Sequence, residues 1–375
     1  MRYTKLGNTN VEIPVVGQGT TGAGSKAIAT PESIKKRIDV LRYGIDLGMN
    51  LLDTADSYED EHTEEIVGQI VHGIRDKVFV CTKFEPKNNS YNGIIQSIEE
   101  SLKRLKTDYI DLYQVHWPNP SIPIYETMSA LTRLVEQGKI RFIGVCNFSP
   151  EEISEADKCL DNDSIVSVQA ELNMYNRIIE KSLIPYCVEY KKTILAYSIF
   201  NQGQFLGNEQ IQFISQLAEK YGVSDHQIIL NWVLSKPPII AVLRSMSFRN
   251  TLSNAKAIEF ELGPEDINRL DSLFIKEPVL IDTSEIKIID YDVDDSHPVY
   301  TTLEGALQNP MGMKPSPADL ATDVVKGKLL KPIELIPAKN SSDVKYFLLH
   351  GRIRFWAWII AFEGKKPIPA YILDR

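Results

Sequence analysis

Three polar side chains close three apolar runs that follow one another along the chain. Asp53 ends the run M-N-L-L-D-T, Lys83 ends V-F-V-C-T-K, and His116 ends Y-I-D-L-Y-Q-V-H. Tyr58 lies shortly after Asp53. One polar residue at the end of an apolar run usually just begins a solvated loop, whereas three in succession predict one shared catalytic site.

These residue types suit the reduction of a carbonyl group, which needs a hydride on carbon and a proton on oxygen. A tyrosine hydroxyl has an ordinary pKa of about 10 and is a poor acid at neutral pH unless a cation stabilises its phenolate. We expect Lys83 to supply that charge, Asp53 to hold the lysine, and Tyr58 to donate the proton. His116 would orient the carbonyl oxygen and stabilise the transition state.

The elements that must position these residues follow one repeating pattern from Ile13 to Leu243. Short apolar runs alternate with longer amphipathic stretches, and the runs span 13–17, 49–54, 78–83, 109–116, 141–146, 165–170, 193–198 and 239–244. Such alternation predicts an α/β fold with a parallel sheet, either open and doubly wound or closed. Eight units over roughly 250 residues favour a (β/α)8 TIM barrel, whose catalytic groups project from the C-terminal ends of its strands.

Local signals mark where several helices begin and end. Thr30 before Pro31 and Ser149 before Pro150 are predicted N-caps, and Gly48, Gly138 and Gly222 are predicted helix stops. The opening residues Y-T-K-L-G-N-T-N-V-E-I predict a hairpin that turns near Gly7. In a barrel this hairpin would close the N-terminal face.

The pattern changes after Phe274, so we assign residues 1–275 to the barrel and 276–375 to a small α+β domain. Residues 290–317 contain an acidic cluster followed by prolines, a composition typical of a linker. Around it we expect a strand near 280, a helix at 320–327, strands at 332–336 and 346–350, a helix after Gly351, and a last strand I-P-A-Y-I-L.

Residues 1 to about 275 resemble the aldo-keto reductase family. The matching pieces are D-T-A-D-S-Y (53–58), T-K (82–83), Y-I-D-L-Y-Q-V-H-W (109–117) and G-K-I-R-F-I-G-V-C-N-F-S (138–149). The resemblance implies that Asp53, Tyr58, Lys83 and His116 are that family's catalytic tetrad. It also implies a small aldehyde or ketone as substrate, and Trp117 is the one residue we expect to form a wall beside it.

The resemblance further implies a nicotinamide cofactor lying extended across the barrel mouth. The residues it assigns to cofactor binding are Gly19, Thr20, Asp53, Asn147, Gln169, Tyr197, Ser198, Gln202, Gly203, Arg244, Ser245, Arg249 and Asn254. Asn147 and Gln169 would hold the carboxamide, and Tyr197 would stack on the nicotinamide ring. No metal is expected.

Cofactor choice depends on L-R-S-M-S-F-R-N-T-L-S-N (243–254). Arg244 and Ser245 suit the adenosine 2′-phosphate through charge-assisted hydrogen bonds, which favours NADPH. Asn250 stands where many NADPH-using members have a second arginine, and Ser253 replaces a common acid. NADH, or use of both cofactors, therefore stays an alternative.

The C-terminal domain resembles the ParB/sulfiredoxin-like fold through L-L-H-G-R-I-R-F-W-A-W and the strands on either side. That fold implies a nucleoside phosphate such as ATP, ADP or CTP at the turn containing Gly351, Arg352 and Arg354. Ile353 replaces one arginine of the fold's usual pair. Arg352 stands in place of the sulfiredoxin cysteine, which excludes sulfiredoxin chemistry. The domain is then either a nucleotide-binding domain or a lid or interaction module.

Composition limits the partners. The net charge of −9 argues against a surface for polyanions, so we expect no nucleic acid as partner. The four cysteines lack metal-ligand spacing, which predicts reduced thiols and a cytoplasmic protein. Neither a signal peptide nor an apolar run long enough for a bilayer is found, so we expect no membrane. The oligomeric state is not indicated.

Two classes of function fit these observations. The first is an NADPH-dependent reductase of an aldehyde or ketone. The second is a barrel that binds the cofactor as a redox sensor and signals through the C-terminal domain. The complete set of four catalytic residues favours the reductase, because a sensor has less need of all four.

Overall fold

The computed structural model describes residues 1–21, 30–58, 62–161, 163–200, 208–274, 278–288, 300–309, 315–326, 330, 332–338 and 344–372. The chain divides into two compact units, Met1–Leu270 and Asp271–Arg375. None of the helices in the described ranges combines the length and the apolar character that crossing a bilayer requires.

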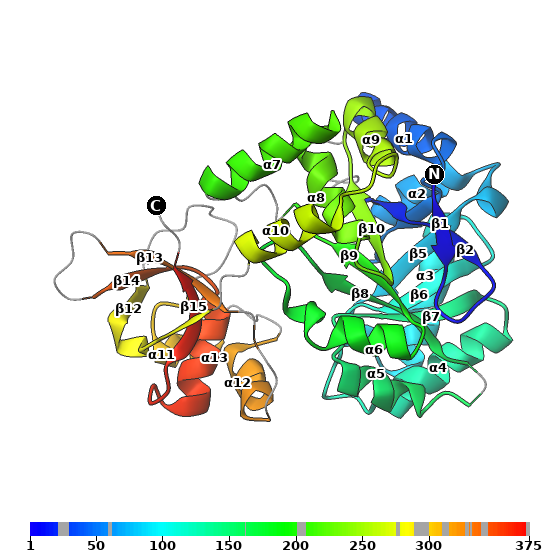
Figure 1. Cartoon of the computed structure of the whole chain (residues 1–375). Helices are drawn as coiled ribbons and strands as arrows, with labels where there is room; N and C mark the ends of the chain where they lie inside the picture. The colour runs from blue at the N-terminus through cyan, green and yellow to red at the C-terminus, as the bar shows by residue number, and fades with distance from the viewer. Residues whose placement is uncertain are drawn as a thin grey trace. The chain divides into compact units, whose positions relative to one another are not determined.

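The first unit is a closed barrel of parallel strands, with helices around the outside (Figure 1). Its strands are β3 (Val16–Gly19), β4 (Leu51–Asp53), β5 (Phe79–Phe84), β6 (Ile110–Val115), β7 (Ile140–Cys146), β8 (Ile165–Glu171), β9 (Thr193–Tyr197) and β10 (Ile239–Arg244). Because β10 pairs in parallel with β3, the sheet is closed, and the predicted barrel is confirmed over the open alternative.

The helices of this unit begin and end close to the predicted signals. They are α1 (Pro31–Asp46), α2 (His62–Val71), α3 (Tyr91–Leu105), α4 (Ile124–Glu136), α5 (Pro150–Asp157), α6 (Leu183–Glu189), α7 (Asn208–Tyr221), α8 (Asp225–Leu234), α9 (Phe248–Lys256) and α10 (Pro264–Phe274), which spans the unit boundary. Thr30 caps α1 by accepting from the Ser33 N–H, and Ser149 and Glu152 form a reciprocal capping box on α5. The predicted stops Gly48, Gly138 and Gly222 all have positive φ angles.

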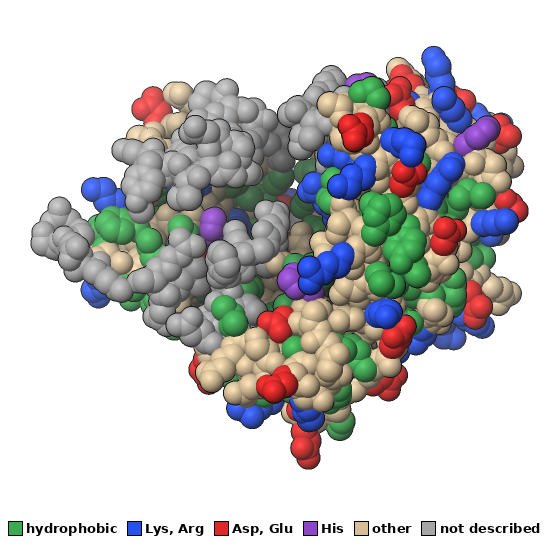
Figure 2. All heavy atoms as spheres, turned by 90° about the horizontal axis from the view of Figure 1, so that it is seen from above, with side chains coloured by type: hydrophobic (Ala, Val, Ile, Leu, Met, Phe, Trp, Pro, Cys, Tyr) green, Lys and Arg blue, Asp and Glu red, His purple; other side chains and the backbone are tan. Residues whose placement is uncertain are grey.

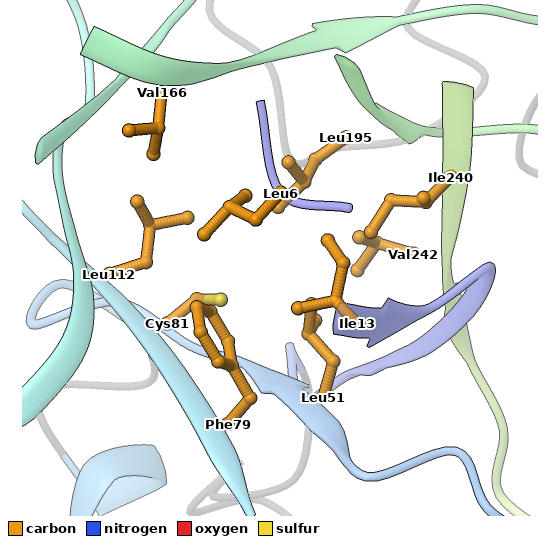
Figure 3. Packing of buried hydrophobic residues seen from close by; sticks show 10 residues of the cluster. All are labelled: Leu6, Ile13, Leu51, Phe79, Cys81, Leu112, Val166, Leu195, Ile240 and Val242. Atoms are coloured by element: carbon orange, nitrogen blue, oxygen red, sulfur yellow. The ribbon is translucent and has the colours of Figure 1, made fainter. Parts of the chain in front are cut away.

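The predicted N-terminal hairpin is confirmed and fills the end of the barrel where the strands begin. Its strands β1 (Tyr3–Lys5) and β2 (Glu12–Pro14) pair antiparallel. Leu6 and Ile13 are fully buried among apolar side chains of the barrel strands (Figure 3). The turn is fastened to β9, because the Gly7 N–H donates to the Thr193 hydroxyl at 2.7 Å.

The predicted first strand, 13–17, needs a correction. Ile13 and Pro14 belong to the hairpin, and the barrel strand begins only at Val16. The apolar run I-P-V-V-G continues through the point where the chain changes pairing partner, so hydrophobicity alone does not reveal the break.

The second unit is built on a five-stranded sheet. Its strands, in spatial order, are β11 (Val279–Ile281), β15 (Ile368–Ile372), β13 (Ile333–Pro337), β14 (Tyr346–His350) and β12 (Ile286–Ile288). The helices are α11 (Leu303–Gln308), α12 (Pro317–Val325) and α13 (Arg352–Phe362). Phe355 of α13 packs in one buried cluster with Ile333, Leu335 and Leu348 of the sheet.

The elements predicted around the linker are confirmed, but the prediction of a linker throughout 290–317 is wrong at Leu303–Gln308. These residues form α11, which Thr302 caps by accepting from the Gly305 N–H. Tyr300 before it is buried, and its carbonyl accepts from Trp356 Nε1 at 2.6 Å. Strand β12 was also not predicted. Both elements are short and depend on partners distant in sequence, which local composition does not reveal.

Charged side chains of both signs share the surface. Figure 2 shows Lys and Arg side chains scattered among Asp and Glu side chains on the face in view. The chain as a whole has 41 basic and 50 acidic residues, so this mixing accompanies a moderate excess of acid.

Candidate active site

The four side chains predicted to be catalytic lie together at one end of the barrel. Asp53 ends β4, Lys83 lies near the end of β5, His116 follows β6, and Tyr58 lies in the turn after β4. The Lys83 ammonium donates to Asp53 Oδ2 at 2.9 Å and to Tyr58 Oη at 3.4 Å. The rings of Tyr58 and His116 lie 6.0 Å apart at 76°.

The two nitrogen bases of this group carry different charges. Burial and the nearby Lys83 charge lower the pKa of His116 from 6.5 to about 3, so its imidazole is neutral at physiological pH. Burial by itself lowers the pKa of Lys83, but the adjacent Asp53 carboxylate outweighs it and holds that pKa above its ordinary value. Lys83 is therefore a fixed cation, and the imidazole is a neutral hydrogen-bonding group.

This arrangement can transfer a proton to a small molecule. Tyr58 and His116 are only partly buried, whereas Asp53 and Lys83 are 3% and 1% exposed. A ligand at the barrel end can thus reach the hydroxyl and the imidazole but not the ion pair behind them. Trp117, predicted as a substrate wall, follows His116 with 43% of its surface exposed.

Beneath these four residues lies a buried layer of amide and thiol groups. Gln169 on β8 donates through Nε2 to Asp53 Oδ2 at 3.2 Å. Its Oε1 accepts from Gln114 Nε2 on β6 at 3.2 Å and from the Cys146 thiol at the end of β7 at 3.3 Å. Gln169, predicted to hold the carboxamide, is therefore bonded to the carboxylate of Asp53, which is predicted to be catalytic.

Sequence reasoning missed Gln114 and Cys146. A signal for Gln114 was present, because it stands two residues before His116, and alternate residues of a strand share a face. Cys146 offered only its place beside Asn147 at the end of a strand.

Sequence reasoning also missed Asp56, which connects the Tyr58 turn to β5. Its N–H donates to the Lys83 carbonyl at 3.0 Å, and its Oδ2 accepts from the Glu85 N–H at 3.3 Å. Burial and the charge of Glu64 raise the pKa of Asp56 from 3.8 to about 7. The signal was a second acid inside D-T-A-D-S-Y.

Most residues predicted to bind the nicotinamide end lie around the same barrel end. Asn147 has a φ of +62°, donates through Nδ2 to the His116 carbonyl at 3.2 Å, and accepts from Tyr197 Oη at 2.8 Å. The Thr20 hydroxyl donates to the Asp53 carbonyl at 2.9 Å. Ser198, with a φ of +54°, follows β9 directly.

The residues predicted to hold the 2′-phosphate lie where β10 leads into α9. Arg244 is exposed and pairs in register with Gly19 of β3. The Ser245 hydroxyl donates to the Ser247 carbonyl at 3.1 Å, and Ser247 caps α9. Two further candidates belong to α9: Arg249, which is exposed in its first turn, and Asn254, which is partly buried nearer its end. Gln202 and Gly203 lie outside the described residues.

The residues predicted to bind a nucleotide phosphate belong to the second unit. Gly351 has a φ of +101° and stands just before Arg352, the first residue of α13. Arg354 Nη1 donates to the Pro332 carbonyl at 2.7 Å. A Cβ at Gly351 would lie 2.8 Å from Arg354 Nη2, so the guanidinium folds back over the glycine.

Comparison with known proteins supports one family. A model described as "Aldo/keto reductase family" matches residues 15–275. Methylglyoxal reductase YeaE of Escherichia coli (strain K12) is 33% identical over 267 residues, which cover 71% of this chain and 92% of that protein. Glyoxal reductase of Bacillus subtilis (strain 168) is 32% identical over 269 residues, which cover 72% and 91%.

Solved structures agree with this match. The thermostable aldo-keto reductase Tm1743, in complex with the inhibitor epalrestat, is 35% identical with a TM-score of 0.70, covering 73% of this chain and 100% of that one. An aldo/keto reductase from Klebsiella pneumoniae, in complex with NADP and acetate, is 32% identical with a TM-score of 0.64, covering 70% and 92%. The chain therefore belongs to the aldo/keto reductase family.

Proposed function

We propose that this protein reduces a small aldehyde or ketone with a hydride from NADPH, and that Tyr58 supplies the proton. Membership of the family makes the chain an NAD(P)H-dependent oxidoreductase acting on carbonyl compounds. The observation that carries the proposal is the Lys83 ammonium, bonded at once to the Asp53 carboxylate and to the Tyr58 hydroxyl.

The contacts of the four residues support one division of roles. When bound, the nicotinamide supplies the hydride to the carbonyl carbon. Tyr58 Oη donates a proton to the carbonyl oxygen, and the Lys83 charge stabilises the oxyanion left on the tyrosine. Asp53 keeps Lys83 charged and in place. His116, neutral with a pKa of about 3, donates a hydrogen bond to the carbonyl oxygen and cannot serve as the acid at neutral pH.

The donor set at the end of β10 fits an anionic cofactor. Arg244 brings a charged guanidinium, Ser245 brings a hydroxyl, and the N-terminus of α9 adds backbone N–H groups. The relatives from Klebsiella pneumoniae were solved with NADP and with NADPH, which supports NADPH here. Asn250 and Ser253 still leave NADH as an alternative.

The substrate is proposed as a small carbonyl compound. Two relatives are named for methylglyoxal and glyoxal, so dicarbonyls of this kind belong in the first panel of substrates. Trp117 is the aromatic side chain that we propose as an apolar wall beside His116.

The experiment that tests the function follows one labelled hydride. The protein is incubated with NADPH or NADH carrying deuterium at the transferred position, and each carbonyl compound of the panel is examined by mass spectrometry. We expect one deuterium in the alcohol product and faster transfer from NADPH. Absence of label in every product would contradict the reductase and favour the cofactor-binding sensor.

For the second unit we propose a ParB/sulfiredoxin-like fold. We also propose that it binds ATP, ADP or CTP at Gly351, Arg352 and Arg354. The left-handed Gly351 before α13 favours a phosphate-binding turn, whereas the bond from Arg354 to the Pro332 carbonyl favours a structural role. Calorimetry of the full chain with each nucleotide tests this. A lid or interaction role is the alternative, and cytoplasmic location stays a prediction.

A further inference from the structure

Five buried side chains form one connected network inside the barrel. Asp53, Lys83, Gln114, Cys146 and Gln169 come from five different strands, and each is at most 3% exposed. Two donors, Lys83 Nζ and Gln169 Nε2, share Asp53 Oδ2. Two further donors, from Gln114 and Cys146, share Gln169 Oε1.

The charge at Asp53 determines the orientation of every other member. An ionised carboxylate only accepts hydrogen bonds, so Gln169 must present its NH2 group to it. The Gln169 carbonyl oxygen then faces the other way and needs donors. Gln114 must therefore also present its NH2 group.

Cys146 must keep its proton for the same reason. Burial raises the pKa of the Cys146 thiol, which agrees with a thiol that donates. The alternative orientation of Gln169 would bring its oxygen against the carboxylate, and two acceptors in contact repel each other.

Gln114 is a polar side chain fully buried inside the barrel. Its Oε1 atom is buried, and no hydrogen-bond partner for it is found among the residues that the structure describes. An unsatisfied buried acceptor costs about 1–3 kcal/mol, whereas an apolar side chain of similar volume would avoid that cost. Packing of the barrel therefore does not explain a glutamine here, but its bond to Gln169 does.

We infer that Gln114 is a positioning residue for carbonyl reduction, because it fixes Gln169 in the orientation that holds Asp53 against Lys83. The inference rests on the proposed function. When Gln114 is present, Asp53 Oδ2 accepts from both Lys83 and Gln169, and the Lys83 ammonium stays beside the Tyr58 hydroxyl. Without Gln114, Gln169 loses one of the two donors that orient it, and the ion pair loses part of its support.

Two substitutions separate positioning from packing. Gln114→Leu keeps most of the volume and removes the donor, so we expect kcat to fall about tenfold at every pH. Gln114→Glu has a donor only while its carboxyl group is protonated. Its activity relative to the wild type should therefore fall as the pH rises from about 5 to about 9.

Ser167→Ala is the matched control. Ser167 is equally buried and lies on β8, and its hydroxyl has no hydrogen-bond partner among the described residues, so this substitution should leave kcat unchanged. If Gln114→Leu does not fold, Gln114→Met is used in its place. The pH dependence of Gln114→Glu then decides between a positioning role and a packing role of Gln114. Wild-type kcat in Gln114→Leu, or equal activity of the Glu and Leu variants at every pH, overturns the inference.

A crystal structure of Gln114→Leu gives a readout that does not need activity. We expect Gln169 Nε2 to move away from Asp53 Oδ2, and an unchanged contact overturns the inference. Failure of the proposed function is recognised separately, because the wild type would then be no faster than Tyr58→Phe with any carbonyl compound.

Discussion

In the proposed reaction, Lys83 carries the charge of the active site and Tyr58 supplies the proton. The neutral state of His116 follows from burial first and from the Lys83 charge second, which leaves Tyr58 as the proposed acid. This division rests on side chains from three neighbouring parts of the barrel, and each role can be tested by a single substitution.

Tyr58→Phe should lower carbonyl turnover by about 10²–10⁴-fold, because it removes the proton donor and keeps the ring. Affinity for NADPH, measured by fluorescence titration, should stay within about twofold of the wild type. Tyr125→Phe is the control, since Tyr125 is 64% exposed on α4. Turnover near the wild-type rate in Tyr58→Phe would show that another group supplies the proton.

Arg244→Ala should weaken NADPH binding by about 1.5–3 kcal/mol, the range for hydrogen bonds to a charged group, and should hardly affect NADH. Calorimetric titration with both cofactors measures the difference. Lys256→Ala, at the far end of α9, is the control for a general loss of positive charge. Equal losses for both cofactors would mean that Arg244 does not recognise the 2′-phosphate.

The four catalytic candidates could be predicted because each polar residue interrupts or follows an apolar run. Gln114 and Asp56 could not be given roles in this way. The role of Gln114 depends on Gln169 of another strand, and the pKa of Asp56 depends on Glu64 and on burial. Contacts between strands decide both, and local sequence carries little record of them.

The barrel elements were predictable where the apolar run and the strand coincide. Runs two to eight match β4 to β10 closely, because a strand covered on both faces is mostly apolar. The prediction of a strand from the first run was wrong at Pro14, because the end of the hairpin and the start of β3 lie in one apolar stretch. Helix α11 was not predicted, because six residues are too few to show a helical pattern and because its position depends on Thr302 and Trp356.

The N-terminal hairpin should stabilise the barrel without taking part in the chemistry. Leu6→Ala is expected to lower the free energy of unfolding by about 2–5 kcal/mol, because Leu6 is fully buried among strand residues. Chemical denaturation measures this loss. Lys5→Ala, exposed in the same hairpin, should change stability by less than about 0.5 kcal/mol. A kcat changed in folded Leu6→Ala would contradict the separation of roles.

The turn between β4 and α2 should make stability depend on pH through Asp56. Its pKa is about 7 in the folded protein and 3.8 ordinarily, so the folded protein keeps a proton that the unfolded chain releases. This stabilisation is complete below about pH 4 and is lost as the pH rises through about 7. Asp56→Asn resembles the protonated state at every pH.

The free energy of unfolding of Asp56→Asn, relative to the wild type, should therefore increase between about pH 5 and about pH 8, by at most about 3 kcal/mol. Urea titrations at several pH values provide the measurement, and the difference between the two proteins removes the contribution of all other groups. A difference that does not change with pH would mean that folding does not raise the pKa of Asp56 into this range.

The whole chain contains two compact units, each with its own buried apolar cluster. We expect two calorimetric transitions on heating. Arg354→Ala should lower the free energy of unfolding of the second unit by about 1–3 kcal/mol, because it removes the hydrogen bond to the Pro332 carbonyl. The transition of the first unit should not change. Carbonyl reduction measured between the two transitions then distinguishes a lid, whose unfolding changes the KM for substrate, from an unrelated domain. One shared transition would contradict independent units.

The closed barrel also has a consequence for synthesis on the ribosome. Strand β3 is among the first strands made and β10 is the last strand of the barrel, yet the two are hydrogen-bonded neighbours. At about 5–20 residues per second, β3 waits roughly ten to forty seconds for this partner. During that interval the unpaired edge of β3 can pair with other chains. The N-terminal hairpin likewise lacks its bond from Gly7 to Thr193, which lies 186 residues later in the sequence, until Thr193 has been made. Chaperones that cover nascent strands should therefore bind this protein before Arg244 has emerged, and release it soon after.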